Sequence, residues 1–314
     1  MSTRSPVLFI VFNRPDTTRR VFEAIRAARP PRLYVAADGP RPHKAGEVER
    51  CEEVRRIATA VDWPCELKTL MSDENLGCKV GESSGMNWFF ENELEGIVLE
   101  DDCLPDPSFF TYCDDLLERY RDDPLVMHIS GDNFISDTWK PEESYYFSQY
   151  VHGWGWASWR RAWQHYDVDM RSWRSGNKRE FLERALPGQP DARLFWGDIF
   201  DRTVNGQIDT WDYQWVYACW KQGGLSCMPK INLISNIGFG EGATHTSNPD
   251  GKHARLGVGS LDTPLKHPTV IEASVYADRW SSENVFDIPN EICIVKRWNR
   301  RLRGRLGKLL RGTG

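Results

Sequence analysis

Three consecutive carboxylates, Glu100, Asp101 and Asp102, are the residues of this chain whose types and spacing most strongly indicate chemistry. They follow the apolar run 96–99, which is typical of a buried strand. Open α/β sheets bind ligands at the carboxyl ends of their strands. Three acids placed there are costly unless a cation meets them. A hard divalent cation, Mn²⁺ or Mg²⁺, prefers a few carboxylates together with phosphate oxygens. The triplet therefore predicts a metal site for a phosphorylated ligand, with a solvated acidic turn as the alternative.

A second pair of acids, Asp209 and Asp212, flanks Trp211 ahead of a helix expected over 213–221. An acid at the start of a helix can cap its N-terminus. An acid beside an exposed Trp can also act as a general base for an acceptor hydroxyl, because desolvation raises its pKa. We expect Asp212 to be the base, with Asp209 as the substitute; capping of the helix is the alternative role.

The segment 236–246 is rich in glycine and polar residues, which is typical of a mobile lid that closes over a ligand. It contains Phe239, Gly240 and His245. His245 is a candidate to ligate the metal or to donate to a phosphate, and the alternative is a histidine in a surface loop.

Tryptophan is concentrated in the second half of the chain, where nine of the fourteen lie between 154 and 220. Aromatic faces are good stacking surfaces for sugar rings, whose axial C–H groups are apolar. Buried aromatic side chains also build cores, and we expect about half of these nine to do only that. The nine are Trp154, Trp156, Trp159, Trp163, Trp173, Trp196, Trp211, Trp215 and Trp220.

Helical patterns separate short apolar runs that predict strands at 7–12, 32–37, 65–70, 97–99 and 125–129. This rhythm predicts an α/β fold with a mostly parallel, Rossmann-like central sheet flanked by helices. Polar residues follow three of the strand ends: Asn13 and Arg14, then Asp38, then the acidic triplet. We expect these residues to meet at the carboxyl edge of one sheet.

Composition and missing motifs exclude several classes of protein. Hydrophobic residues make up 40% of the 314 residues, enough for a packed core. The chain has no GxxxxGK[ST] loop, no GxGxxG after the first strand and no HExxH. It has no GxSxG elbow between a strand and a helix, since its GxSxG pattern at 81–85 falls within an expected helix. The eight cysteines include no CxxC pair, and no apolar stretch approaches the roughly 18 residues of a spanning helix. These features favour a cytoplasmic protein with reduced thiols.

The last twenty residues are basic, in contrast to the rest of the chain. Eight Lys and Arg side chains and no acid lie within 295–314, which leaves a net charge of −13 on residues 1–294. Leucines and Trp298 recur among them at spacings of three or four, so the segment predicts an amphipathic helix for an anionic membrane surface or a partner. A disordered tail is the alternative, and the acidic body disfavours nucleic acid as a partner.

Over most of residues 5–250, these motifs resemble a GT-A-fold glycosyltransferase, closest in pattern to the N-acetylglucosaminyltransferase I type. The resemblance implies that Arg14 holds a nucleotide-sugar and that Asp38 contacts the uracil. The triplet matches the DxD motif, which implies that Asp102 touches Mn²⁺ while Glu100 and Asp101 address the sugar and the ribose. We also expect Lys79 to be among the residues that bind the nucleotide-sugar.

The resemblance continues in the second half of the chain. The residues 153–156, with Trp154 and Trp156, resemble the family's Gly-Trp segment ahead of the acceptor site. The pair Trp211 and Asp212 matches a Trp-Asp pair whose Asp is the catalytic base, and the loop from Phe239 and Gly240 to His245 resembles a substrate-ordered loop.

Three departures limit what the resemblance implies. The family has a second acid after the Trp-Asp pair, where this chain has Tyr213, and a basic lid residue where this chain has Glu241. The family's enzymes are Golgi proteins with a membrane anchor, which this sequence does not show. The resemblance therefore carries fold, metal and reaction class, and leaves donor sugar and acceptor open.

Together the sequence predicts one continuous GT-A domain with a nucleotide-sugar half at 1–135, an acceptor and catalytic half at 136–290, and the tail at 291–314. The predicted activity is metal-dependent, inverting transfer of a sugar, such as N-acetylglucosamine, from a UDP-sugar to a hydroxyl of a glycan or lipid-linked acceptor. The predicted location is the cytoplasm, with a peripheral place at the inner membrane face. A sugar-nucleotide nucleotidyltransferase and a non-catalytic sugar-binding or membrane-active protein are the alternatives.

Overall fold

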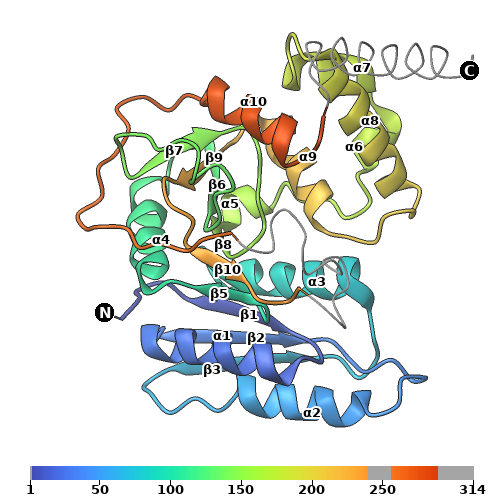
Figure 1. Cartoon of the computed structure of the whole chain (residues 1–314). Helices are drawn as coiled ribbons and strands as arrows, with labels where there is room; N and C mark the ends of the chain where they lie inside the picture. Colours follow the sequence, from blue (N-terminus) through green and yellow to red (C-terminus); the bar gives the residue numbers. More distant parts are fainter. Residues whose placement is uncertain (1, 240–255, 289–314) are drawn as a thin grey trace, which may run out of the picture.

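The computed structural model describes residues 2–239 and 256–288, and an eight-stranded sheet runs through the middle of this part (Figure 1). The strand order is β3-β2-β1-β4-β8-β6-β9-β7, so strands from both halves of the chain share one sheet. The strands are β1 Val7–Val11, β2 Arg32–Ala37, β3 Glu66–Met71, β4 Glu95–Glu100, β6 Val126–Ser130, β7 Tyr145–Ser148, β8 Trp156–Trp159 and β9 Leu225–Pro229.

The sheet is mixed, so the prediction of a mostly parallel sheet is confirmed only in part. Strands β3, β2, β1 and β4 are parallel, as the alternation of strands and helices predicts. Strand β8 is antiparallel to both β4 and β6, and β7 is antiparallel to β9. The Trp-rich run of β8 carries no alternation that would mark a strand, so its insertion between β4 and β6 was not predicted.

The two faces of the sheet bury alternate residues of each parallel strand, as the period of two requires. In β1, Val7, Phe9 and Val11 pack on one side, and Leu8 and Ile10 on the other. The first face is covered by α1 Pro15–Ala28, α2 Glu47–Ala58 and α4 Pro107–Arg119. The second is covered by α3 Gly77–Asn92 and by the helices of the second half, so the core has two layers (Figure 1).

Five of the remaining helices lie together around the tryptophans of the second half. They are α5 Arg160–Trp163, α6 Arg171–Ser175, α7 Lys178–Ala185, α8 Pro190–Val204 and α9 Asp212–Gln222. Helix α10, Val275–Asn284, packs against β7 instead. Eight of the nine tryptophans between 154 and 220 are buried, and only Trp154 is partly exposed. Core packing therefore accounts for more of them than the half that we expected.

A small second sheet lies against the end of β4. It pairs β5 Cys103–Pro105 with β10 Ile234–Asn236 in antiparallel register, with Asn236 opposite Cys103. The pairing continues one residue further, since the Ile237 amide donates to the Asp102 carbonyl at 2.8 Å. The short sheet therefore brings the chain around 237 directly beside the acidic triplet.

Among the described residues, no helix is both long and apolar enough to cross a membrane. The seven described cysteines are free thiols, and five of them are buried. The predicted tail at 291–314, with its membrane-binding role, lies outside the described residues, as does most of the predicted lid.

Candidate nucleotide-sugar site

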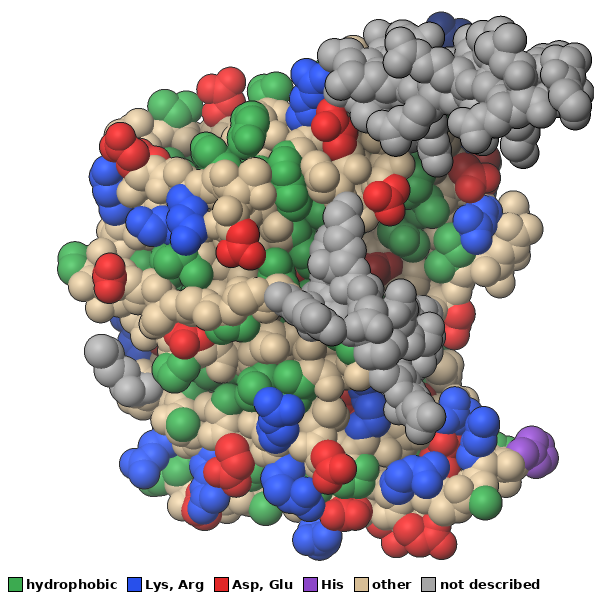
Figure 2. Space-filling view, in the orientation of Figure 1, with side chains coloured by type: hydrophobic (Ala, Val, Ile, Leu, Met, Phe, Trp, Pro, Cys, Tyr) green, Lys and Arg blue, Asp and Glu red, His purple; other side chains and the backbone are tan. Residues whose placement is uncertain are grey.

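A cavity of about 780 Å³ lies at the carboxyl ends of β1, β2 and β4 and against the first turns of α3. On this side Figure 2 shows the molecule hollowed between the helical second half and the lower part of the sheet, with acidic side chains in the hollow. The sequence predicted this meeting of strand ends. The predicted residues that line the cavity are Asn13, Arg14, Asp38, Glu100, Asp101 and Asp209.

Arg14 connects the end of β1 to the acidic triplet. It stands directly before α1, whose first residue is Pro15, and its guanidinium donates to Asp102 Oδ2 at 3.0 Å and to Asp101 Oδ1. Burial alone would lower the pKa of Arg14, but the two carboxylates outweigh burial and raise it. Burial raises the pKa of Asp101 to about 6, although Arg14 opposes that rise. Arg14 is therefore a fixed cation at the point where we expected phosphate.

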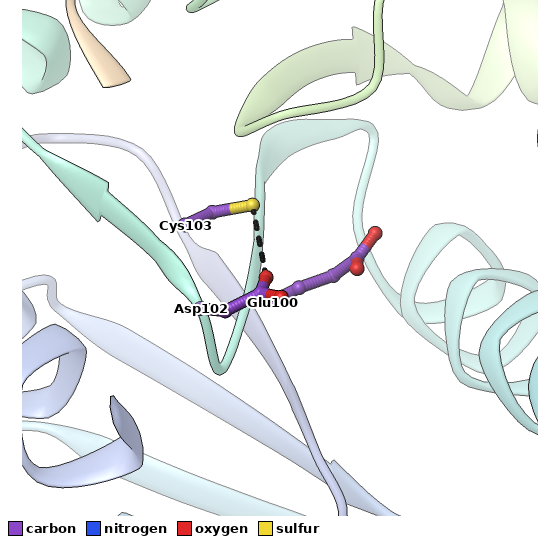
Figure 3. Close-up of side chains that lie close together, drawn as sticks. All are labelled: Glu100, Asp102 and Cys103. Atoms are coloured by element: carbon purple, nitrogen blue, oxygen red, sulfur yellow. Dashed lines mark hydrogen bonds between the residues drawn. The ribbon is translucent and has the colours of Figure 1, made fainter. Parts of the chain in front are cut away.

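Glu100, Asp102 and Cys103 form the one group among the described residues with metal-ligand spacing, since one ligand atom from each lies within 4.8 Å of the others. Figure 3 shows the Cys103 thiol aimed at Asp102, to which it donates at 3.5 Å. Two carboxylates suit Mn²⁺ or Mg²⁺, whereas burial raises the pKa of the Cys103 thiol well above its usual value. The donor set fits a hard cation held by Glu100 and Asp102, with Cys103 as a hydrogen-bond donor.

Gly238 closes over Asp102 from the small sheet. A Cβ at position 238 would overlap Asp102 Oδ2 and would lie 2.6 Å from Arg14 Nη1. Only a glycine allows the backbone to approach the ion pair this closely. Asp102 is consequently 6% exposed.

Asp38 stands at the cavity, but its carboxylate is engaged by the protein. Its Oδ1 accepts from the amides of Gly39 and Leu76, each at 2.8 Å. Its Oδ2 accepts from Asn75 Nδ2 at 2.8 Å and from the Gly77 amide at 3.2 Å. The resemblance assigned this carboxylate to the uracil, and the structure gives it four donors of the chain itself.

Asn13 belongs to a buried network at the same edge. Its Nδ2 donates at 2.8 Å to Glu47, a carboxylate with no exposed surface. Arg41 is the main reason that the pKa of Glu47 is lowered to about 2. The network fixes Asn13 beside the cavity.

Glu82 is a cavity residue that the sequence analysis did not identify. It lies on α3 four residues after Cys78, so both side chains share the helix face turned toward the sheet, and both line the cavity. Burial, and then the neighbouring carboxylates, raise the pKa of Glu82 to about 8 and that of Glu100 well above its usual value. Both side chains are partly exposed at the cavity wall. By contrast, Lys79 on the same helix is not among the lining residues.

The two candidate bases approach the site from the start of α9. Asp212 Oδ1 accepts from Thr210 Oγ1 at 2.5 Å and from the Tyr213 amide at 2.7 Å. Asp212 is the first residue of α9, and the N-cap position is Trp211 without a side-chain cap, so the predicted N-cap role of Asp212 is not found. Its charge contributes to the raised pKa of Glu82, which places it near α3. Asp209 lines the cavity, and its Oδ2 lies 3.2 Å from where a Cβ of Gly77 would stand.

The predicted aromatic residues occupy different positions. Trp156 has no exposed surface and stacks on Trp211, which is 3% exposed, with ring centroids 5.5 Å apart. These two rings are packed in the core, whereas we expected both to contact the acceptor. Trp154 is partly exposed and packs edge to face on Phe239, with ring centroids 5.9 Å apart. A partly exposed aromatic ring is available to contact a ligand. Gly240 and His245 lie outside the described residues.

Comparisons with known proteins do not assign the chain to a family. No family model matches the chain, and no curated protein matches it. Among solved structures, apo UDP-glucose pyrophosphorylase matches at 8% identity and a TM-score of 0.30, covering 51% of this chain and 78% of that one. The complex of UDP-glucose pyrophosphorylase with UDP-glucose matches at 9% identity and 0.30, with 52% and 78% covered.

The glycosyltransferase GlyE of Streptococcus pneumoniae TIGR4 also matches, at 11% identity and a TM-score of 0.29, covering 72% of this chain and 45% of that one. These neighbours are enzymes of UDP-sugars and a glycosyltransferase by their names. At such TM-scores the likeness carries no argument for this chain, and the site has to be interpreted from its own residues.

Proposed function

We propose that the chain is an inverting, metal-dependent glycosyltransferase of the GT-A fold, which moves a sugar from a UDP-sugar to an acceptor hydroxyl. The observation that carries the proposal is the convergence in one cavity of Arg14, Glu100, Asp101 and Asp209, from β1, β4 and the segment before α9. Asp102 is buried beside this cavity and accepts a hydrogen bond from Arg14. Acids and a cation gathered at the carboxyl ends of parallel strands suit a nucleotide diphosphate with its metal.

In this proposal the chain's own residues do most of the electrostatic work. Arg14 is the proposed cation for the leaving diphosphate, because its guanidinium lines the cavity and lies beside Asp102. A divalent cation held by Asp102 and Glu100 supplies further neutralisation of the leaving group's charge when it is bound. Asp101, held by Arg14, addresses the ribose or sugar hydroxyls.

Asp212 is the proposed base, with Asp209 as its substitute. The base takes the proton of the acceptor hydroxyl as the acceptor oxygen bonds to the anomeric carbon, and the bond to the diphosphate breaks on the opposite face. Approach from the face opposite the leaving group gives inversion. Trp154 and Phe239 offer apolar surface for the acceptor or the donor sugar.

A nucleotidyltransferase is the second candidate, since it also uses acids and a metal. Such an enzyme usually carries a Gly-rich, basic loop after its first strand. Here the turn Asn13–Arg14 leads straight into α1 at Pro15, and Arg14 is engaged by the triplet.

For the proposed glycosyltransferase, the proposed acceptor is a glycan or lipid-linked glycan. The proposed location is the cytoplasm, with 295–314 at an anionic membrane surface.

The test measures UDP release from a panel of UDP-sugars with Mn²⁺ for the wild type, Asp102→Ala and Asp212→Ala. Thermal shift with the same panel first selects the donor, because a ligand that binds the native state raises the melting temperature. Asp16→Ala is the matched control, since its carboxylate is fully exposed on α1. We expect both site variants to lose release and the control to keep it. Binding or release that survives EDTA and both substitutions unchanged would contradict the mechanism.

A further inference from the structure

Helix α3 begins without a cap of its own. Its N-cap position is Leu76, which has no side-chain hydrogen bond to the helix, and its first turn contains no acid. The first amides of a helix need acceptors, and a negative charge is favourable beside them. The Asp38 carboxylate, from the end of β2, accepts from the amides of Leu76 and Gly77. A strand end therefore caps a helix that begins 39 residues later in the chain.

The turn before α3 is held from several sides. Asn75 Nδ2 donates to Asp38 Oδ2 at 2.8 Å and to the Gly39 carbonyl at 3.0 Å. Gly39 in turn lies so close to the backbone of Glu74 that a Cβ there would stand 2.6 Å from its nitrogen. The turn 75–77 is thus packed against the end of β2 as a single unit.

This turn supports residues of both halves of the site. The first two turns of α3 bring Cys78, Gly81 and Glu82 to the cavity. Gly77, with a φ of 77°, stands against Asp209. A shift of the turn would therefore move Glu82 and disturb the contact with Asp209.

We propose that Asp38 is a positioning residue: it fixes the turn 75–77 and the start of α3, and so places Glu82 in the donor cavity. Its four hydrogen bonds use both carboxylate oxygens, so recognition of the base edge falls to other groups. The statement that Glu82 faces a donor nucleotide-sugar rests on the proposed function. The capping of α3 by Asp38 is independent of the proposed function.

The nucleotide pair UDP and CDP distinguishes positioning from base recognition. Uracil presents an N3–H donor, which a carboxylate can accept, whereas the N3 of cytosine is itself an acceptor. If Asp38 positions α3, Asp38→Ala weakens UDP and CDP alike, by about fivefold, because the competent arrangement is less populated. The UDP-to-CDP affinity ratio then stays within about twofold of the wild type. A fall of this ratio by about tenfold would overturn the proposal.

Asn75→Ala removes a donor from the same carboxylate and serves as the second variant. We expect it to reproduce the equal loss for both nucleotides, and the double variant to lose less than the two single losses combined. Glu74→Ala is the control, because that side chain is exposed directly before the turn. Additive losses in the double variant would contradict a shared role.

Hydrogen exchange of the free protein tests the cap without any nucleotide. The amides of Leu76 and Gly77 should exchange at least several-fold faster in Asp38→Ala than in the wild type, whereas the amides of α1 should not change. Unchanged exchange at 76 and 77 would overturn the positioning role. If wild-type protein bound neither nucleotide, the proposed function would fail, and this exchange measurement would still decide the role of Asp38.

Discussion

Arg14 donates from Nη1 to Oδ2 of Asp102 at 3.0 Å, so the carboxylate proposed to hold the metal is already paired with a cation. A divalent ion has to compete with this guanidinium for Asp102. The pairing also removes much of the repulsion within the triplet when no metal is bound.

The first prediction concerns this competition. Arg14→Gln should strengthen binding of Mn²⁺ alone by several-fold, since Asp102 loses its competing cation, and should weaken binding of UDP, which loses a cation. Calorimetric titration with Mn²⁺ alone and with UDP alone measures both effects. Arg19→Gln, an exposed residue of α1, is the control. If the Arg14 variant bound Mn²⁺ more weakly than the wild type, Arg14 would be a support of the metal site and not a competitor.

The second prediction separates the two candidate bases. Asp212→Asn should lower kcat by about 10²- to 10⁴-fold with little change in donor affinity, because the amide cannot accept a proton. It keeps an oxygen that can accept from Thr210 and from the amide of Tyr213, so these two hydrogen bonds survive. Asp209→Asn should lower kcat far less. Turnover of the two variants decides the assignment, and the reverse order would make Asp209 the base.

How far the sequence could predict this site is clear from particular residues. The strand ends of β1, β2 and β4 were predicted because short aliphatic runs bounded by turn residues mark buried parallel strands. Arg14 and the triplet could therefore be placed at one edge. Their pairing could not, because it joins residues 88 positions apart through side-chain geometry.

Other features had no local signal. Glu82 lies in the first half of a helix whose large buried side chains, Met86, Phe89 and Phe90, all come later, so its inward side was not evident. Trp156 and Trp211 were expected at a ligand surface because tryptophan suits sugars, yet the same side chains fill the core between β8 and α9. Composition alone does not separate these roles.

The third prediction concerns the close approach of Gly238. Gly238→Ala would place a methyl group against Asp102 Oδ2 and Arg14 Nη1, so either the ion pair or the backbone at 238 has to move. We expect at least a tenfold loss of nucleotide binding, reported by the UDP titration. Gly257→Ala is a matched control, since a Cβ there meets nothing within 4 Å. Equal behaviour of the two variants would contradict the tight closure.

The fourth prediction contrasts two tryptophans. Trp156→Ala removes a fully buried ring and should destabilise the fold by about 3–5 kcal/mol. Trp154→Ala, at a partly exposed position, should cost clearly less stability and lower acceptor-dependent turnover instead. Urea unfolding measures the first effect and steady-state kinetics the second. A similar loss of stability in both variants would place Trp154 in the core.

The fifth prediction uses Asp132, a buried carboxylate at the end of β6 that accepts from Ser130 Oγ at 2.6 Å. Burial raises its pKa to about 7, against about 3.9 in an unfolded chain. Between these two values the folded state binds more protons than the unfolded state, so its free energy of unfolding falls as pH rises. Asp132→Asn cannot ionise and loses this dependence.

Relative to the wild type, Asp132→Asn should therefore gain stability from about pH 5 to about pH 8, by on the order of 2 kcal/mol. A steric cost of fitting the amide at position 132 is present at both pH values and cancels in the comparison. Urea unfolding of both proteins at the two pH values measures the difference, with Asp16→Asn as the exposed control. A stability difference that does not change with pH would show that Asp132 is ionised throughout, with its charge compensated inside the fold.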